Sequence, residues 1–277
     1  MYYSEEDARR IVIEAGLKLI ENGLIARTWG NISARISKDE FIITPSGLAY
    51  EGLTPDKLVK VKASDLSYEG NIKPSSEKGV HAISYILRPE TNFIIHTHQF
   101  YATAISLEGK DTELAAASEY GLSGTDKLKA KVMQAISKHP DKKAFFMERH
   151  GAVILGESLD EAFEIAGKLE EECKAIFKET VNEDDYIFAA SQKFTSLRAY
   201  IDDFAQILGS SVDLKKPVSE ICNGSDAEAE RMILEKNCAA ALFAKAKKIK
   251  PLGLLDANLQ RTVYLTKYSK LKDKEKK

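Results

Sequence analysis

The sequence has few cysteines, no long apolar run and no excess of charge of either sign. Its 277 residues include three widely spaced cysteines and no CxxC pair, which argues against a disulfide framework and predicts a reducing compartment, the cytoplasm. No apolar stretch approaches the roughly 20 residues of a membrane span, and the acidic start MYYSEEDARRIVIEAG is unlike a secretory signal. With 40 Lys and Arg against 42 Asp and Glu, we expect neither nucleic acid nor membrane as a partner.

The chain contains enough apolar residues, 44%, to build a sizeable core without disulfides or metals. Strand-like runs, such as NFIIHTH at residues 92–98, alternate with helical patterns such as the one that Ser158 and Glu161 begin. This alternation indicates an α/β layered domain over residues 1–185. The pattern of residues 186–277 is mainly helical, with helices expected around 197–208 and 226–248, and predicts an extension packed on the first domain.

Two histidines, His96 and His98, stand two residues apart at the end of an apolar strand. Side chains alternate along a strand, so both imidazoles are expected on the same face. Imidazole is the commonest metal ligand, and His150, before a glycine at a strand junction, is a candidate third ligand. Three protein ligands with an open position are typical of catalytic zinc. A pair of hydrogen-bonded core histidines is the alternative that this spacing leaves open.

Small polar residues occur in turns beside the predicted strands, in GNIS at residues 30–33, TPSG at 44–47 and PSSE at 74–77. Hydroxyl groups and unpaired backbone N–H groups at a helix N-terminus bind anions, phosphate in particular. Taken singly, each segment is more typical of an ordinary turn or helix N-cap than of a binding site.

Taken together, these segments resemble a known family. GNIS, ITPSGLAY, PSSE ahead of His81, His96-Thr-His98 and HGAVILGESLDEA occur in the order and spacing of the class II aldolase/adducin family, which includes zinc-dependent fuculose-phosphate aldolases and ribulose-phosphate 4-epimerases. The resemblance covers roughly residues 5–180. It implies a three-layer α/β/α fold with a largely antiparallel central sheet, to which this chain adds the C-terminal helical extension.

The resemblance also implies roles for individual residues. His96, His98 and His150 would bind Zn²⁺ or another divalent metal, and Glu77 would serve as the acid/base. The substrate phosphate would be held by residues of the small-residue turns, namely Asn31, Ser46, Gly47, Ser75 and Ser76. His81 is interpreted as a packing or supporting residue.

The predicted activity is that of a metal-dependent lyase, which cleaves a phosphorylated ketose through an enediolate to dihydroxyacetone phosphate and an aldehyde. Two alternatives are a sugar-phosphate 4-epimerase or dehydratase using the same site, and a non-catalytic adducin-like binding module. The presence of Glu77 and all three histidines favours an enzyme. Related proteins are commonly homotetramers, so the resemblance implies a homo-oligomer.

The sequence departs from the family pattern at three places. Arg149 stands before His150 where the family usually has Asn, which predicts a difference around the pocket. The stretch from His98 to Tyr120 is shorter than in fuculose-phosphate aldolases, and the proton-transferring tyrosine of that region has no assigned counterpart. The extension contains adjacent acids, Asp202 and Asp203, which lack metal-ligand spacing and are interpreted as acids at a helix N-terminus.

Overall fold

A seven-stranded mixed sheet forms the centre of the protein. The computed structural model describes residues 2–25, 29–181, 194–224 and 226–268. The sheet order is β3-β2-β1-β4-β7-β6-β5, and β5 and β6 form its one parallel pair among the described residues. The strands of this sheet are β1 (Asn31–Arg35), β2 (Glu40–Ile43), β3 (Val59–Lys62), β4 (Phe93–Thr97), β5 (Ala115–Ser118), β6 (Ala144–Met147) and β7 (Gly151–Gly156).

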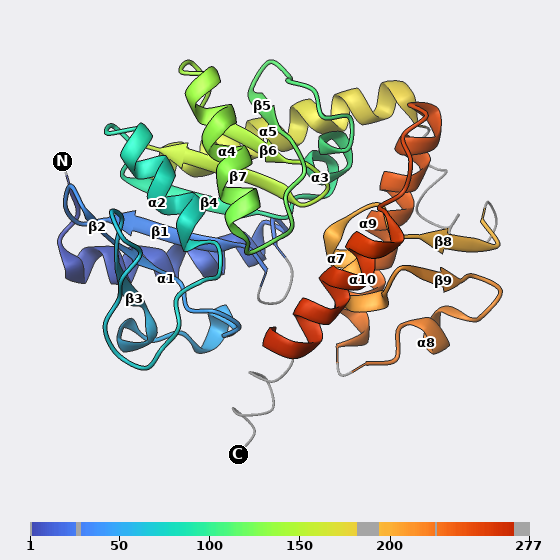
Figure 1. The fold of residues 1–277 in the computed structure, drawn as a ribbon, viewed down its shortest axis with the longest axis horizontal. Coiled ribbons are helices and arrows are strands. Elements are labelled where there is room, and N and C mark those ends of the chain that lie inside the picture. The colour runs from blue at the N-terminus through green and yellow to red at the C-terminus, as the bar shows by residue number, and fades with distance from the viewer. Residues whose placement is uncertain (1, 26–28, 182–193, 225, 269–277) are drawn as a thin grey trace.

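Helices cover both faces of the sheet. The helices of this domain are α1 (Glu5–Glu21), α2 (Lys78–Leu87), α3 (Phe100–Ser106), α4 (Asp126–Lys138) and α5 (Leu159–Thr180), with short 3₁₀ turns η1 (Tyr50–Gly52) and η2 (Pro55–Lys57). Alternate residues of β4 enter different cores: Phe93 and Ile95 pack with α1, α3 and α5, and Ile94 packs with α2 and α4. The predicted three-layer fold with a largely antiparallel sheet is confirmed (Figure 1).

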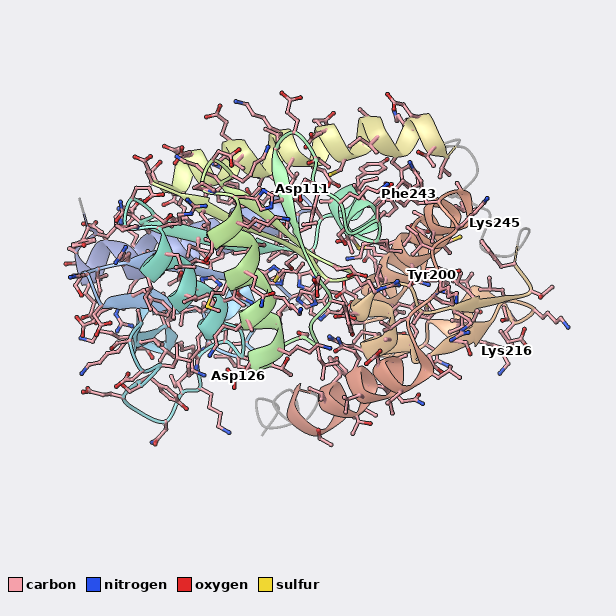
Figure 2. All side chains as sticks on the ribbon, turned by 45° about the horizontal axis from the view of Figure 1, so that its top comes forward. Asp111, Asp126, Tyr200, Lys216, Phe243 and Lys245 are labelled. Carbon is pink, nitrogen blue, oxygen red and sulfur yellow. The ribbon has the colours of Figure 1, made fainter. Side chains whose placement is uncertain are left out.

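The C-terminal segment, residues 194–268, packs beside this sheet (Figure 1). Its elements are β8 (Ser196–Arg198), α7 (Asp202–Leu208), β9 (Ser211–Asp213), α8 (Val218–Ile221), α9 (Ala227–Ala246), α10 (Leu254–Val263) and the π-helical turn η4 (Tyr264–Tyr268). Phe243 of α9, labelled in Figure 2, stacks on Phe177 of α5 with ring centroids 6.1 Å apart. The apolar core therefore continues from the sheet domain into the C-terminal segment.

Local sequence signals account for several helix starts. The side chains of Ser4, Thr125 and Ser158 each accept a backbone hydrogen bond at the N-cap of α1, α4 and α5. The expected helix around residues 197–208 differs, because residues 196–198 pair with β9 and the helix begins at Asp202. The predicted domain boundary at 185 and 186 lies outside the described residues. All three cysteines are buried and, among the described residues, form no disulfide.

No helix among the residues described is both long enough and apolar enough to cross a bilayer.

Candidate active site

The three histidines lie together where β4 ends and β7 begins. Asn31 of β1 pairs with His96 of β4, and Val153 of β7 pairs with His96 on its other side. His98 follows the end of β4, and His150 directly precedes β7. All three side chains are buried, and one nitrogen from each ring lies within 4.8 Å of the others. The predicted proximity of the histidines is therefore found.

His96 and His98 are each held through Nδ1. The Nδ1 of His96 lies 3.0 Å from the carbonyl oxygen of Ala152, and the Nδ1 of His98 lies 2.8 Å from Oδ1 of Asp203. These oxygens accept hydrogen bonds, so the network assigns the ring hydrogen to Nδ1. Burial lowers the pKa of both histidines below the ordinary value. Both rings are neutral and present a lone pair at Nε2, as a metal ligand must.

His150 completes the cluster. Its Nδ1 lies 3.3 Å from Oδ2 of Asp202, and its Nε2 lies 3.1 Å from Nε2 of His96. The Nε2 atoms of His96 and His150 therefore face each other, and two nitrogen lone pairs repel at this distance unless a proton or a cation lies between them. Three inward-facing imidazoles, each anchored at its other nitrogen, suit a divalent metal ion.

Glu77 lies against this cluster, immediately before α2. Its Oε1 is 3.1 Å from Nε2 of His150, and its Oε2 is 3.3 Å from Nε2 of His96. Burial raises the pKa of Glu77, but charge interactions with His96 and His150 outweigh burial and hold the pKa well below its usual range. Burial lowers the pKa of His150, but the carboxylates of Glu77 and Asp202 raise it to about 10. With no cation bound, the His150 ring is therefore protonated and pairs with the ionised carboxylate of Glu77.

A chain of buried hydrogen bonds orients the Glu77 carboxylate. Asn31 donates from Nδ2 to Oε2 of Glu77 over 2.8 Å, and Oδ1 of Asn31 accepts from Nε2 of His81 over 2.5 Å. Ser33 Oγ lies 2.7 Å from Nδ1 of His81 and 2.7 Å from the hydroxyl of Tyr85. His81 thus supports Asn31, which holds Glu77. Asn31, predicted to bind phosphate, also belongs to this network.

Because His81 is buried and neutral, it should make the protein sensitive to acid. Burial lowers the pKa of His81 to about 4, whereas an unfolded chain binds that proton near pH 6.5. Between these values the unfolded state binds more protons, so the free energy of unfolding should fall as pH decreases, by up to about 3 kcal/mol from this group. Urea titrations of metal-free protein between pH 7 and 4 should show a shallower pH slope for His81→Gln. Identical slopes would contradict this assignment.

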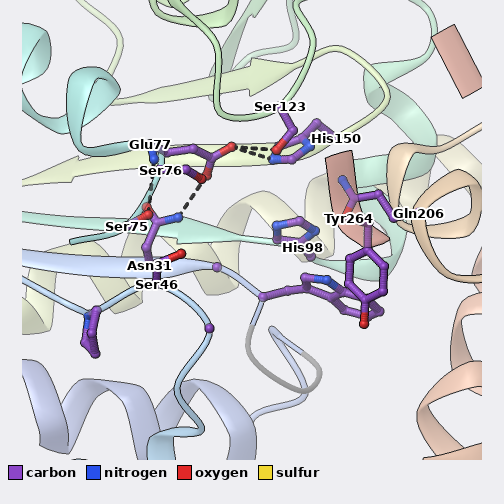
Figure 3. Close-up of a pocket in the computed structure, with 14 residues that line it drawn as sticks. Asn31, Ser46, Ser75, Ser76, Glu77, His98, Ser123, His150, Gln206 and Tyr264 are labelled. Carbon is purple, nitrogen blue, oxygen red and sulfur yellow. Dashed lines mark hydrogen bonds and ion pairs between the residues drawn. The ribbon is translucent and has the colours of Figure 1, made fainter. Parts of the chain in front are cut away.

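Two small-residue turns form the pocket wall next to Glu77. The backbone N–H of Ser46 donates to the carbonyl of Lys73 over 2.9 Å, and that of Ser75 donates to Thr44 over 3.0 Å. Gly47 has a φ of 77°, a left-handed conformation that glycine adopts without strain. The pocket is lined by Trp29, Gly30, Asn31, Pro45, Ser46, Gly47, Ser75, Ser76, Glu77, His98, Ser123, His150, Gln206 and Tyr264 (Figure 3).

The structure thus brings every predicted phosphate-binding residue to one pocket with Glu77, His98 and His150. His96 is not one of the pocket-lining residues, but its Nε2 lies 3.3 Å from Oε2 of Glu77, which is. Ser123, absent from the prediction, donates from its Oγ to Oε1 of Glu77 over 3.1 Å. Nothing in its local pattern, GLSGT, distinguishes it from a turn serine.

Gly151 allows β7 to approach β4 beside the histidines. A Cβ at this position would lie 2.1 Å from the carbonyl oxygen of Thr97 and 3.3 Å from Cε1 of His96. We expect Gly151→Ala to push the strands apart, lowering both the melting temperature and the affinity for Zn²⁺ or Co²⁺. Gly167→Ala, at an exposed position of helix α5, is the control, since a Cβ there has no neighbour within 4 Å; it should stabilise the fold by about 0.5–1 kcal/mol. Unchanged metal affinity in Gly151→Ala would contradict this prediction.

Sequence reasoning also missed the contacts of the adjacent acids Asp202 and Asp203 with the site histidines. They do begin helix α7, as interpreted, but both are fully buried and face His150 and His98. Burial raises the pKa of Asp202 to about 6. Burial also raises the pKa of Asp203, but His98 and Lys236 lower it far below its usual range, so Asp203 is ionised.

Comparison with known proteins agrees with this geometry. The sequence model described as Class II Aldolase and Adducin N-terminal domain matches residues 10–177. The chain belongs to this family. It is 31% identical over 173 residues to L-fuculose phosphate aldolase of Escherichia coli (strain K12), covering 58% of this chain and 78% of the relative. It is 30% identical over 190 residues to 3-oxo-tetronate 4-phosphate decarboxylase of Pectobacterium atrosepticum, covering 63% of this chain and 85% of that relative.

A solved structure of L-fuculose 1-phosphate aldolase superposes with a TM-score of 0.58 at 26% identity, covering 70% of this chain and 99% of that one. This class II aldolase family match ends at residue 177, before the C-terminal segment that contains Asp202 and Asp203. The chain therefore has a class II aldolase-type core to which residues outside the family match contribute part of the pocket.

Arg149 connects this core to the C-terminal segment. It has a φ of 66°, a left-handed conformation that the asparagine expected here from the family resemblance would adopt more readily. Its guanidinium donates to the carbonyls of Tyr200 over 3.2 Å and Lys250 over 3.1 Å, and its own carbonyl accepts from the N–H of Asp202 over 2.9 Å. The predicted difference at position 149 concerns docking of the C-terminal segment, since Arg149 is not among the pocket-lining residues.

Proposed function

We propose that this protein is a zinc-dependent class II aldolase-type lyase that cleaves a phosphorylated ketose to dihydroxyacetone phosphate and an aldehyde. One observation carries the proposal. Three inward-facing histidines and the Glu77 carboxylate adjoin a pocket whose wall contains the small-residue turns. Membership in the class II aldolase family and similarity to L-fuculose phosphate aldolase support this choice of reaction.

In this proposal the Nε2 atoms of His96, His98 and His150 hold the metal. A bound divalent ion supplies Lewis-acid polarisation of substrate oxygens and stabilises the negative charge that develops when the carbon–carbon bond breaks. Glu77 carries the proton: its ionised carboxylate, held by Asn31 and Ser123, takes up the proton that the substrate hydroxyl releases as the carbon–carbon bond breaks, and then returns it to the carbon of the triose fragment where the bond was. A buried carboxylate fixed by two donors loses little freedom in this step.

The phosphate group would bind at the turns formed by Ser46, Gly47, Ser75 and Ser76. The serine hydroxyls of these turns can donate hydrogen bonds to an anion without bringing a positive charge near the metal. In Figure 3 Ser75, Ser76 and Asn31 lie on one side of His98, and Gln206 and Tyr264 lie on the other. A substrate with phosphate on the turns would therefore extend toward these two residues of the C-terminal segment with its aldehyde portion.

The second candidate is decarboxylation of a 3-oxo acid phosphate, favoured by the similarity to 3-oxo-tetronate 4-phosphate decarboxylase. Loss of carbon dioxide, like cleavage of the ketose, leaves negative charge next to a carbonyl group, and the same metal and turns serve both reactions. The products distinguish these reactions from each other and from 4-epimerisation or dehydration, which release neither triose phosphate nor carbon dioxide.

The deciding experiment is a product screen with zinc-reconstituted protein over pentulose and hexulose 1-phosphates and a 3-oxo acid phosphate. The proposal expects dihydroxyacetone phosphate from at least one ketose, detected by coupled reduction, and an aldehyde in equal amount. If the metal-loaded protein releases carbon dioxide and no triose phosphate, the proposed activity becomes decarboxylation. If it yields an epimer and no triose phosphate, the proposed activity becomes 4-epimerisation. A protein that binds no metal and turns over none of the substrates would favour the binding module.

The homotetramer and the cytoplasmic location also belong to this proposal. Light scattering on the purified protein measures the first, and microscopy of a fluorescent fusion in the source cell measures the second.

A further inference from the structure

Two of the three site histidines are anchored by the C-terminal segment. The Nδ1 of His96 bonds within the sheet, to Ala152. The corresponding atoms of His98 and His150 instead bond to Asp203 and Asp202, 26 and 25 residues beyond position 177, where the family match ends. The orientation of these two rings therefore depends on residues outside the family core.

Asp203 is built into a buried charged triangle. Its Oδ1 lies 2.8 Å from Nδ1 of His98, and its Oδ2 lies 2.5 Å from Nζ of Lys236 on α9. The same Nζ donates to the backbone carbonyl of His98 over 3.1 Å. Asp203 is 1% exposed and Lys236 is 7% exposed. Two charges buried this deeply are costly unless each is paired and hydrogen-bonded, and here both are bonded to His98.

Asp202 has a comparable arrangement around His150. Its Oδ2 lies 3.3 Å from Nδ1 of His150, and its Oδ1 accepts from the hydroxyl of Tyr120 over 3.2 Å. That hydroxyl accepts in turn from Nε2 of Gln260 on α10, over 3.3 Å. Each aspartate thus contacts one histidine with one oxygen and is fixed by a second partner through the other oxygen.

The start of α7 is itself held in place. Asn237 of α9 accepts at Oδ1 from the backbone N–H groups of Tyr200 and Ile201, over 2.8 and 3.2 Å. Arg149 binds the carbonyl of Tyr200 from the core side. The backbone just before the two aspartates is therefore hydrogen-bonded both to α9 and to the sheet domain.

We propose that the C-terminal segment is a working part of the metal site: Asp203, supported by Lys236, and Asp202 are positioning residues that aim Nε2 of His98 and His150 at a divalent cation. A carboxylate on the outer nitrogen fixes the tautomer and makes the ligand nitrogen more basic. The inference rests on the proposed function only in that the three histidines bind a metal, whichever reaction follows.

The test measures Co²⁺ binding by the full chain, through its visible d–d absorption and by competition with a chelator. We expect Asp203→Ala to weaken Co²⁺ binding by about 10–100-fold, the usual cost of losing such a partner, and to change the absorption spectrum. Asp203→Asn keeps an oxygen that accepts from Nδ1 and should recover part of the affinity. Lys236→Met should lie between wild type and Asp203→Ala. Glu228→Ala, an exposed acid at the start of α9, is the matched control and should bind as wild type does.

The result that overturns the inference is wild-type affinity and spectrum in Asp203→Ala. If that variant does not fold, Asp202→Ala and Lys236→Met take its place, and wild-type affinity in both overturns the inference equally. Failure of the proposed function has a different signature: the wild type binds Co²⁺ or Zn²⁺ and the aspartate variants bind it weakly, but no ketose phosphate yields triose phosphate.

Discussion

Glu77→Gln should reduce the rate of ketose-phosphate cleavage by about 10²–10⁴-fold, the range typical of a lost general acid/base. Glutamine has nearly the same shape, and its single oxygen can still accept from Asn31, while its NH2 group faces the hydroxyl of Ser123; these two residues contact different oxygens of Glu77 over 2.8 and 3.1 Å. It has no basic oxygen to carry the proton. Steady-state rates with zinc-loaded protein, assayed by dihydroxyacetone phosphate release, measure the effect.

Metal content and melting temperature are the controls for this variant. Three histidines remain, so we expect a full equivalent of zinc and a native melting curve in Glu77→Gln. If Glu77→Gln binds zinc and its cleavage rate is within threefold of wild type, Glu77 is not the acid/base of the reaction. The exposed Glu228→Gln variant provides the matched control for loss of a carboxylate, and its rate should equal that of wild type.

His96→Ala should abolish metal binding and activity together. His96 lies centrally, with its Nε2 3.1 Å from Nε2 of His150 and 3.3 Å from Oε2 of Glu77. With two imidazoles left, we expect bound zinc to fall from one equivalent to near zero after dialysis, as measured by elemental analysis. Thermal unfolding should also lose its metal dependence, since binding at 1,000 times Kd stabilises a fold by about 4 kcal/mol.

His139→Ala is the control for His96→Ala. The ring of His139 faces Asp111, 3.5 Å away on another part of the surface, so its removal should change neither zinc content nor rate. A metal-free His96→Ala protein that kept full activity would contradict the metal site and the lyase proposal with it.

Motifs that are local in the sequence were the ones that predicted the site. His96 and His98 lie two residues apart at a strand end, and strand alternation brings their ring centroids within 4.5 Å. The glycine after His150 marked a predicted junction between strands. In the structure a Cβ at Gly151 would lie 2.1 Å from the carbonyl oxygen of Thr97, so glycine is required there. These features depend on residues that are close together in the sequence, so the local sequence pattern was enough to predict them.

Contacts between distant segments were not predictable in the same way. Asp203 and His98 are 105 residues apart, and Lys236 lies 138 residues from His98. The local pattern at Asp202 and Asp203 is that of acids at a helix N-terminus, and this interpretation is correct for α7. That interpretation did not include the contacts of the two aspartates with His98 and His150. Those contacts arise only when the chain is packed, and the spacing of residues within 200–209 does not indicate them.

The sequence alone thus determined the layered α/β architecture, the family, and the residue types of the proposed metal and phosphate sites. These follow from periodicity, turn chemistry and short motifs, which act over a few residues. Tertiary structure alone decided how the pocket is completed. Arg149 docks a segment outside the family match, and the same docking places Asp203, Lys236 and Asp202 behind the histidines. Buried charges are tolerated only where partners meet in three dimensions, so the chain must fold before those pairs exist.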